Sequence, residues 1–236
     1  MKLPNFHVFS NVVRGGREAL RRRIRTPLAG RFQAHSHTLP NRYPWLFEFA
    51  KSQIGDDPRS RLLSFGCSRG DEVFSLREYF PAAEIKGVDI DPRNIKQCLK
   101  RSRSEAAVGV TFAVASTTEN EPARTFDAIF CLAVLCLGDL TATRAVRCDP
   151  CLRFEDFERI VTDFERCLKP GGLLFLHTSN FRFSDTAVAP RFEVMLEAKP
   201  DQLAPDVLFG RDNRLLKGVR YHEVVFRKRA ARDSQL

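Results

Sequence analysis

The stretch RLLSFGCSRGDEVFSL, residues 61–76, decides the fold. Its apolar start, Arg61–Phe65, is typical of a short buried strand, and Gly66 and Gly70 then lead into a helix that we expect to end near Phe80. Glycines at such a turn let the backbone approach a ligand closely, and the helix N-terminus offers free N–H donors and the positive end of its dipole. The same turn could also serve only to pack the strand tightly against the helix.

The rest of the chain repeats this pattern. From residue 61 onward strand-like and helix-like segments alternate, which is typical of an α/β fold with a parallel sheet. We expect further strands at 84–90, 110–115, 126–132, 173–177 and 221–227, the last of them at the sheet edge. We expect helices at 13–25, 43–54, 91–103 and 154–168. The stretch 178–220 is too weakly patterned to predict an element.

Asp89 ends the second expected strand, 23 residues after Gly66. An acidic residue at about this distance can accept the hydroxyl groups of a ribose. Its alternative role is that of a helix N-cap, which Asp91 would fill better. Ser68 stands where a pyrophosphate-binding turn has its second glycine, and the chain has no Gly-Lys-Ser/Thr of a P-loop. The sequence therefore favours a nucleoside-containing ligand over a dinucleotide or a nucleoside triphosphate.

Four segments carry further signatures in a fixed order: RLLSFGCSRGDEVFSL (61–76), IKGVDIDP (85–92), TFDAIFCLAVL (125–135) and CLKPGGLLFLHT (167–178). They resemble motifs I, II and IV and the segment before strand five of class I S-adenosylmethionine-dependent methyltransferases. The first is especially similar to the chemotaxis-receptor methyltransferase-like branch. The resemblance covers about half of the chain.

This resemblance implies an architecture and a cofactor. The fold would be α/β, with a doubly wound, mostly parallel seven-stranded Rossmann-like methyltransferase sheet, and the cofactor would be S-adenosylmethionine. We expect residues 1–60 to form a basic N-terminal helical arm and cap, and residues 61–236 to form the S-adenosylmethionine-binding methyltransferase domain.

The resemblance also implies a cofactor site. By that comparison, the cofactor-binding residues are Gly66, Cys67, Ser68, Arg69, Gly70, Asp89, Ile90, Ser116, Thr117, Cys131 and Leu132. The glycine turn would hold the methionine portion, and Asp89 the ribose hydroxyls, with Ile90 against the adenine face. The two residues after the third expected strand would lie at the adenine edge. Cys131 and Leu132, which close the fourth expected strand, would line the pocket near the sulfonium.

Ser64 departs from the family pattern, because most relatives carry an acidic residue at this point of the first strand. The loss is tolerable if backbone amides and Arg69 or Arg42 hold the cofactor carboxylate.

The implied reaction is a direct in-line displacement at the sulfonium, which depends on positioning more than on covalent help. A general base is needed only if the acceptor must lose a proton. His177 is the candidate, because the carboxyl end of the fifth expected strand points into the same crevice. The alternative is a histidine with structural partners only. Asn180, Phe181 and Phe183 come next and are candidates to shape the acceptor pocket.

The charge of the chain bears on its partners. The net charge is +9, and residues 1–60 hold 11 Lys or Arg against 4 Asp or Glu. A second basic patch follows near the C-terminus, at Arg227, Lys228, Arg229 and Arg232. Such patches attract polyanions and anionic substrates. No Asn/Asp-Pro-Pro-Tyr segment follows the fourth expected strand, where CLAVLC stands, and this argues against methylation of the amino groups of nucleic-acid bases. We expect a small-molecule acceptor, the alternatives being an RNA or other polyanion bound through the arm, a protein acceptor, and cofactor binding without catalysis.

No apolar run is long enough for a membrane-spanning helix and no secretory signal opens the chain, so we expect a cytoplasmic protein. The 7 cysteines are scattered rather than spaced as a disulfide framework. Cys148 and Cys151 form a CxxC, but no second pair completes a zinc site, so no metal is expected and reactive loop thiols are the simpler interpretation.

Overall fold

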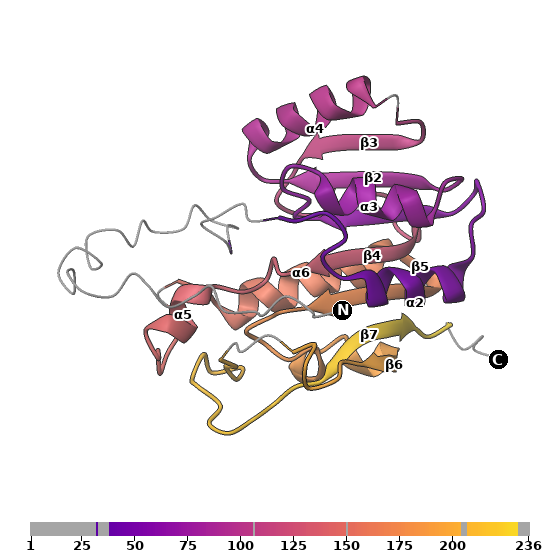
Figure 1. The fold of residues 1–236 in the computed structure, drawn as a ribbon. Helices are drawn as coiled ribbons and strands as arrows, with labels where there is room; N and C mark the ends of the chain where they lie inside the picture. Colours follow the sequence, from indigo (N-terminus) through magenta and orange to yellow (C-terminus); the bar gives the residue numbers. More distant parts are fainter. Residues whose placement is uncertain (1–31, 33–37, 106, 150, 204–206, 231–236) are drawn as a thin grey trace, which may run out of the picture.

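The computed structural model describes residues 32, 38–105, 107–149, 151–203 and 207–230 (Figure 1). Within them a seven-stranded sheet has the order β3-β2-β1-β4-β5-β7-β6. β1 to β5 pair in parallel with one another, whereas β7 runs antiparallel to β5 and β6. The strands are β1 (Arg61–Phe65), β2 (Glu84–Asp89), β3 (Val110–Val114), β4 (Phe126–Leu132), β5 (Leu168–His177), β6 (Phe192–Glu197) and β7 (Glu223–Lys228). The predicted mostly parallel, doubly wound sheet is confirmed.

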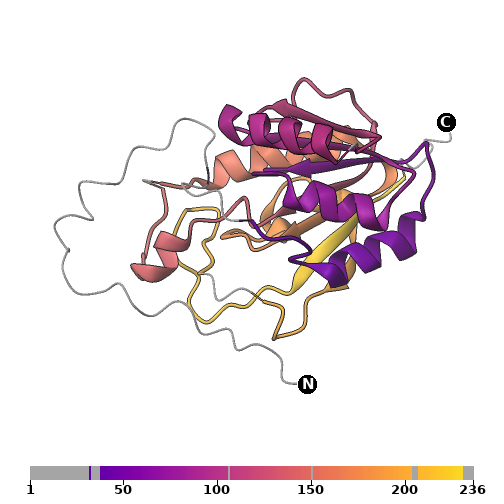
Figure 2. The same ribbon diagram turned by 45° about the horizontal axis from the view of Figure 1, so that its top comes forward.

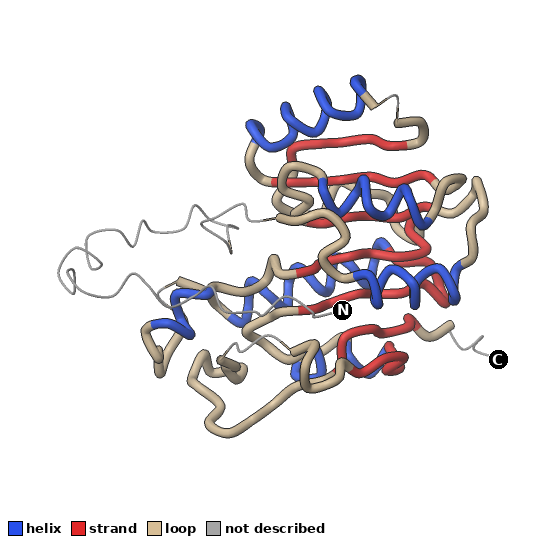
Figure 3. The backbone as a smooth tube through the Cα atoms, viewed as in Figure 1, coloured by secondary structure: helices blue, strands red, loops and turns tan. Residues whose placement is uncertain are grey.

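Helices cover both faces of this sheet. They are α2 (Pro44–Ile54), α3 (Asp71–Tyr79), α4 (Pro92–Ser104), α5 (Gly138–Ala142) and α6 (Phe154–Cys167), with the 3₁₀ turns η1 (Phe183–Asp185) and η2 (Ala189–Arg191). Figure 2 shows α2, α3 and α4 together in front of the sheet and α6 behind it. In Figure 3 the strands, in red, form one continuous stack from β3 at the top to β6 at the bottom.

Alternation along the strands explains why the core has two layers. In β1, Leu62 packs in the layer of α2 and α3, whereas Leu63 and Phe65 pack in the layer of α6. β4 alternates in the same way, with Phe130 in the first layer and Ile129 in the second. Successive strand side chains point to opposite faces, so a central strand buried on both sides reads as one continuous apolar run.

Local signals fix the helices that flank the candidate site. Asp91 caps α4, because its side chain accepts a hydrogen bond from the Arg93 amide at 2.9 Å, and Pro92 occupies the first turn. Gly70 precedes α3 in the left-handed conformation, with φ of 90°. The N-cap role therefore falls to Asp91, as expected, and Asp89 has a different task.

Two strand predictions are wrong in detail. β5 begins at Leu168, directly after α6, and not at Leu173, so Pro170 and Gly171 lie within the strand and do not precede it. The reason is a bulge: Phe126 pairs with Leu168 before the register shifts, which extends the strand backwards.

The predicted last strand is not at the sheet edge. β7 lies between β5 and β6, and the edge strand is β6, which we did not predict. β6 has poor alternation because its pairing with β7 is irregular, with register shifts between Val194 and Leu196 and between Leu196 and Glu197. The short α5 was also not predicted.

The predicted helix at 13–25 and the arginine-rich part of the arm lie outside the described residues, whereas the predicted helix at 43–54 is confirmed as α2. Across the described ranges, no helix has both the length and the apolar character needed to cross a membrane.

Candidate functional site

The turn after β1 has the close packing expected of a ligand-binding loop. Gly66 has φ of 76°, and a Cβ atom built on it would lie 2.5 Å from a methyl group of Val134 in the segment after β4. Its amide and that of Cys67 both donate to the Val88 carbonyl, at 2.8 and 2.9 Å. Gly70 has φ of 90°, and a Cβ there would meet Phe74 at 2.9 Å. Both positions thus require glycine for conformation and for space.

Asp89 holds this turn in place. Its Oδ2 accepts a hydrogen bond from the Ser68 amide at 2.8 Å, while Oδ1 accepts from the Asp91 amide at 2.8 Å and from Asn94 Nδ2 at 3.0 Å. A carboxylate has about four acceptor directions. Three are used inside the protein, so Asp89 has capacity for about one more donor, such as a single ligand hydroxyl.

Ser68 has an unsatisfied hydroxyl at the centre of the turn. Its φ is 50°, and its Oγ is buried without a hydrogen-bond partner among the described residues. Buried polar groups normally have a partner, because an unmet hydrogen bond costs about 1–3 kcal/mol. The Ser68 hydroxyl is therefore a group that a bound ligand could satisfy.

Glu72, in the first turn of α3, supplies a carboxylate beside the turn that we did not predict as part of the site. Its Oε1 accepts a 2.7 Å hydrogen bond from the hydroxyl of the fully buried Ser64. Burial raises the pKa of Glu72 to about 8, against the opposing effects of the Ser64 hydrogen bond and the Arg42 charge. The missed signal was the Asp-Glu pair that follows Gly70 in the first motif.

The two arginines proposed for the cofactor carboxylate differ in their surroundings. The Arg42 charge acts on Glu72, Tyr43 and His177, so this arginine lies by the site, with its guanidinium 5.1 Å from the centre of the Tyr43 ring. Arg69 is exposed on the turn itself.

The other predicted cofactor residues lie at the ends of their strands. Ile90 follows β2, and Ser116 and Thr117 follow β3; all three are half-buried. Cys131 is fully buried near the end of β4, where burial raises its thiol pKa well above the usual value, and Leu132 is 7% exposed. Most of the predicted set therefore gathers at the carboxyl edge of the sheet.

The cysteine in the turn is held as a neutral thiol. A hydrogen bond with Cys98 and burial both raise the pKa of Cys67, and both sulfurs lie near the Ser68 carbonyl oxygen, at 3.8 Å for Cys67 and 3.3 Å for Cys98. Cys67 therefore acts as a small packing residue of the turn.

β4 and β5 both end in strained backbone. Ala133 has φ of 57° and Thr178 has φ of 59°, and the Ala133 amide donates to the His177 carbonyl at 2.8 Å. A β-branched residue in this region is a true outlier. Such strain costs of order 1–3 kcal/mol and is concentrated at functional sites.

His177 lies at the end of β5 with both ring nitrogens engaged. Nε2 is 2.9 Å from the Gln202 carbonyl, which can only accept, so Nε2 carries the proton and Nδ1 accepts from the Thr178 hydroxyl at 2.8 Å. The ring is 5% exposed, and burial lowers its pKa. The structure thus leaves His177 neutral, and its basic nitrogen faces Thr178.

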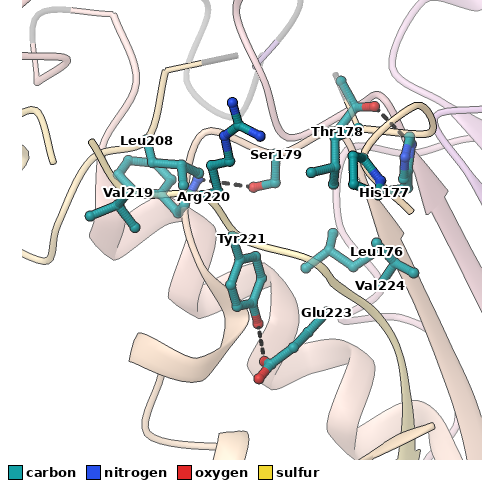
Figure 4. Close-up of a pocket in the computed structure, with 13 residues that line it drawn as sticks. Leu176, His177, Thr178, Ser179, Leu208, Val219, Arg220, Tyr221, Glu223 and Val224 are labelled. Carbon is teal, nitrogen blue, oxygen red and sulfur yellow. Dashed lines mark hydrogen bonds between the residues drawn. The ribbon is translucent and has the colours of Figure 1, made fainter. Parts of the chain in front are cut away.

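A cavity of about 430 Å³ opens beside this histidine (Figure 4). It lies between the end of β5 and the segment before β7, with His177, Thr178 and Ser179 on one side and Tyr221 and Glu223 on the other. The remaining wall is formed by Arg220 and by mostly apolar residues, namely Leu176, Phe181, Pro200, Leu203, Leu208, Val219 and Val224.

Tyr221 and Glu223 form a hydrogen-bonded pair on one side of this cavity. Figure 4 shows the Tyr221 ring extending to Glu223, and its hydroxyl donates to Glu223 Oε2 at 2.6 Å while accepting from the Ser184 amide at 3.2 Å. Burial and the Glu223 carboxylate raise the pKa of Tyr221. The cavity therefore combines apolar side chains with a carboxylate, a neutral phenol and the Arg220 cation.

Phe181 lines this cavity, and Asn180 connects two segments near it. Asn180 is fully buried; its Oδ1 accepts from the Leu137 amide at 2.6 Å and its Nδ2 donates to the Val207 carbonyl at 2.7 Å. The side chain thereby joins the segment after β4 to the one that borders the cavity.

The sequence model of a family described as methyltransferase domain matches residues 56–214, more than half of the chain. The chain belongs to this family. The match confirms the predicted class, an S-adenosylmethionine-dependent methyltransferase, and it spans the glycine turn, Asp89 and the end of β5. No curated protein sequence matches this methyltransferase at a significant level.

Several solved structures are similar to part of the chain. The PH0226 protein of Pyrococcus horikoshii OT3 is 19% identical with a TM-score of 0.44, over 57% of this methyltransferase and 55% of the other chain. Phosphoethanolamine N-methyltransferase 2 of Haemonchus contortus, in complex with S-adenosylmethionine, is 20% identical with a TM-score of 0.44, over 60% and 29%. Geranyl diphosphate C-methyltransferase of Streptomyces coelicolor, with S-adenosylhomocysteine, is 17% identical with a TM-score of 0.41, over 56% and 44%. The methyltransferase thus spans about half or less of these chains.

The CxxC of this methyltransferase is split between two environments. The Cys148 thiol is buried against the Asn213 carbonyl at 3.6 Å, and burial raises its pKa to about 12, whereas Cys151 is half-buried. Across the described residues, no group of three or more His, Cys, Asp or Glu is arranged to hold a metal ion.

Proposed function

We propose that this methyltransferase transfers the methyl group of S-adenosylmethionine to a small-molecule acceptor bound in the cavity beside His177. The observation that carries the proposal is the position of that cavity. It begins where β5 ends, and His177 pairs with Leu132 at the end of β4, next to the glycine turn after β1. An acceptor in it would lie at the same edge of the sheet as the cofactor residues.

We assign the cofactor residues from side chains that have hydrogen-bonding or charge capacity left for a ligand. Among the described residues the buried Ser68 hydroxyl has no partner, and Asp89 retains capacity for about one hydroxyl donor. Glu72 is a half-buried carboxyl group with a pKa raised to about 8, and a cation beside it would stabilise its ionised form. We assign the ammonium of the cofactor to Glu72, its carboxylate to Arg42 and its ribose to Asp89. When bound, S-adenosylmethionine would supply an electrophilic methyl group, which passes to the acceptor as the carbon–sulfur bond breaks and S-adenosylhomocysteine leaves.

We assign His177 as the base that receives a proton from the acceptor, through the hydroxyl of Thr178. Thr178 lines the cavity and its hydroxyl donates to Nδ1, so this hydroxyl is the group through which a proton lost by the acceptor would reach the ring. Because His177 is neutral, it can take up this proton without first losing one.

The cofactor site is tested by calorimetric titration with S-adenosylmethionine and S-adenosylhomocysteine, on the wild type and Asp89→Ala, at two salt concentrations. We expect binding that depends little on salt and is lost in the variant. Absence of binding of either ligand to folded protein would overturn the cofactor assignment.

The acceptor class is tested with methyl-labelled S-adenosylmethionine and a cell extract separated by size. We expect label in the low-mass fraction, and its loss in Val219→Trp, because Val219 lines the cavity and is exposed enough to be enlarged without unfolding. Val194→Trp, equally exposed on β6, is the matched control and should keep the activity. Label in RNA or protein instead would overturn the small-molecule assignment.

A further inference from the structure

A second cavity, of about 640 Å³, lies at the opposite end of the sheet from the cofactor residues. Arg124, just before β4, and Lys228, the last residue of the antiparallel β7, both line it. Arg191 and Arg229 complete its set of cations. Two residues of the C-terminal basic patch, Lys228 and Arg229, therefore line this cavity. The side chain of Arg227, on the other face of β7, donates to Gln53 instead.

The charges around this cavity do not balance. Four cationic side chains line it, against the single carboxylate of Glu165. Both oxygens of that carboxylate already have a cationic partner, with Oε1 2.9 Å from Lys228 Nζ and Oε2 3.1 Å from Arg191, and its one negative charge offsets only one of the four cations. The cavity therefore carries an excess of positive charge that Glu165 cannot neutralise.

One of the four cations, Lys228, has a structural role at the end of α6. Its ammonium also donates to the carbonyls of Glu165 and Leu168 at the C-terminus of α6, where a cation stabilises the negative end of the helix dipole. It is 12% exposed in its side chain, so it is a structural residue of the helix end.

The arginines keep unused donors. In the part of the chain that the structure describes, the Arg124 guanidinium makes no hydrogen bond or ion pair, and Arg229 uses only its Nε, which donates to the Phe192 carbonyl at 3.1 Å. Arg191 is 65% exposed in its side chain despite its ion pair with Glu165. Three guanidinium groups from separate segments thus border one cavity with donors to spare.

We propose that this cavity is a binding site for a polyphosphate group, such as a pyrophosphate or the phosphates of a phosphorylated small molecule. Planar guanidinium groups match phosphate oxygens in pairs, and a multiply charged anion would neutralise the excess of positive charge. The cavity is also larger than a single phosphate requires. This site is separate from the methyl-transfer site, and its existence does not depend on the proposed acceptor.

The test is calorimetric titration of the full chain with inorganic pyrophosphate at constant ionic strength. We expect saturable binding, weakened about tenfold by Arg124→Gln and by Arg229→Gln, since each removes charged hydrogen bonds. Arg124→Lys, which keeps the charge but loses the planar pair of donors, should fall between. Arg103→Gln removes an exposed arginine at the end of α4 and is the matched control, which should bind as the wild type does.

Two further measurements keep the result interpretable. Thermal unfolding of each variant checks that it folds, and S-adenosylmethionine affinity should be the same in all four variants as in the wild type. No saturable binding at millimolar pyrophosphate would overturn the proposal. So would equal losses in Arg124→Gln and Arg103→Gln, which would mean that the anion responds only to the overall charge.

Discussion

The hydroxyl of Ser64 in β1 donates a 2.7 Å hydrogen bond to Oε1 of Glu72 in α3. The family resemblance led us to expect an acidic residue at the position of Ser64, and Glu72 brings a carboxyl group beside that serine from the next helix.

Stability should therefore fall as the pH rises. The Glu72 pKa is about 8 in the folded protein, above its ordinary value of 4.5, so between these values the folded state holds a proton that the unfolded state has lost. The free energy of unfolding should decrease through this window by up to about 1.4 kcal/mol per pH unit from this group. Denaturant unfolding between pH 5 and about 8 measures it. Glu72→Gln should flatten the curve, and an identical slope in both proteins would contradict the assigned shift.

Cofactor binding should release a proton near neutral pH. At pH 7 Glu72 is mostly protonated, and a cofactor ammonium beside it would favour the carboxylate. Calorimetry in buffers of different ionisation enthalpy should report release of about one proton in the wild type and little in Glu72→Gln. Buffer-independent heats for the wild type would place the ammonium elsewhere.

Gly66→Ala should destabilise the fold by about 2–4 kcal/mol, from a left-handed backbone and from overpacking against Val134. Gly171→Ala separates these effects, because Gly171 has φ of 80° but nothing within 4 Å of an added Cβ. It should cost only about 1–2 kcal/mol. Denaturant unfolding gives both values, and Val134→Ala should partly rescue Gly66→Ala. Equal costs at the two glycines would show that contact with Val134 is unimportant.

Asp89→Asn should weaken both stability and cofactor binding. The amide keeps one acceptor oxygen and places an NH₂ group against N–H donors, so at least one of the hydrogen bonds from Ser68, Asp91 and Asn94 is lost. We expect a loss of about 2 kcal/mol or more. Asp91→Asn is the matched control, since Asn caps a helix about as well as Asp. Similar behaviour of the two variants in unfolding and titration would refute the special role of Asp89.

Thr178→Val should lower stability by about 1–3 kcal/mol, because it leaves Nδ1 of His177 buried without a donor. Valine has the same shape and the same β-branch, so backbone strain is unchanged. Thr178→Ser keeps the hydroxyl and should retain stability. If His177 receives the acceptor proton through this hydroxyl, only Thr178→Val should also shift the pH profile of turnover.

Sequence alone predicted the part of the fold that short-range patterns control. The order of β1, the glycine turn and α3 is written in neighbouring residues, and the bounds of β4, Phe126–Leu132, agree with the prediction. The turn residues and Asp89 lie together as predicted, because β1 and β2 pair in parallel and their carboxyl ends meet at one edge of the sheet.

Most of what was missed depends on contacts between distant segments, and β6 exists only because β7 pairs with it. Glu72 is an exception: its signal stands in the first motif, but its hydrogen bond to Ser64 becomes evident only when α3 is packed on β1. The cavity joins Thr178 to Tyr221, which no periodicity connects. The engagement of both His177 nitrogens likewise depends on Gln202, in a stretch without a clear pattern.

The irregular pairing of β6 bears on how the molecule avoids joining others of its kind. An open edge strand has a row of unpaired amides and carbonyls with which a strand of another chain can pair, and a bulge disrupts the regular spacing that this pairing needs. β6 has an extra residue at Met195, and β7 compensates with one at Val224, so the edge is broken while the register beyond it is restored. The exposed carboxylate of Glu197, at the end of this strand, adds repulsion between copies, whereas Glu193 is paired with Arg227 at 3.8 Å. The feature that hid β6 from sequence analysis thus also protects the sheet from growing by aggregation.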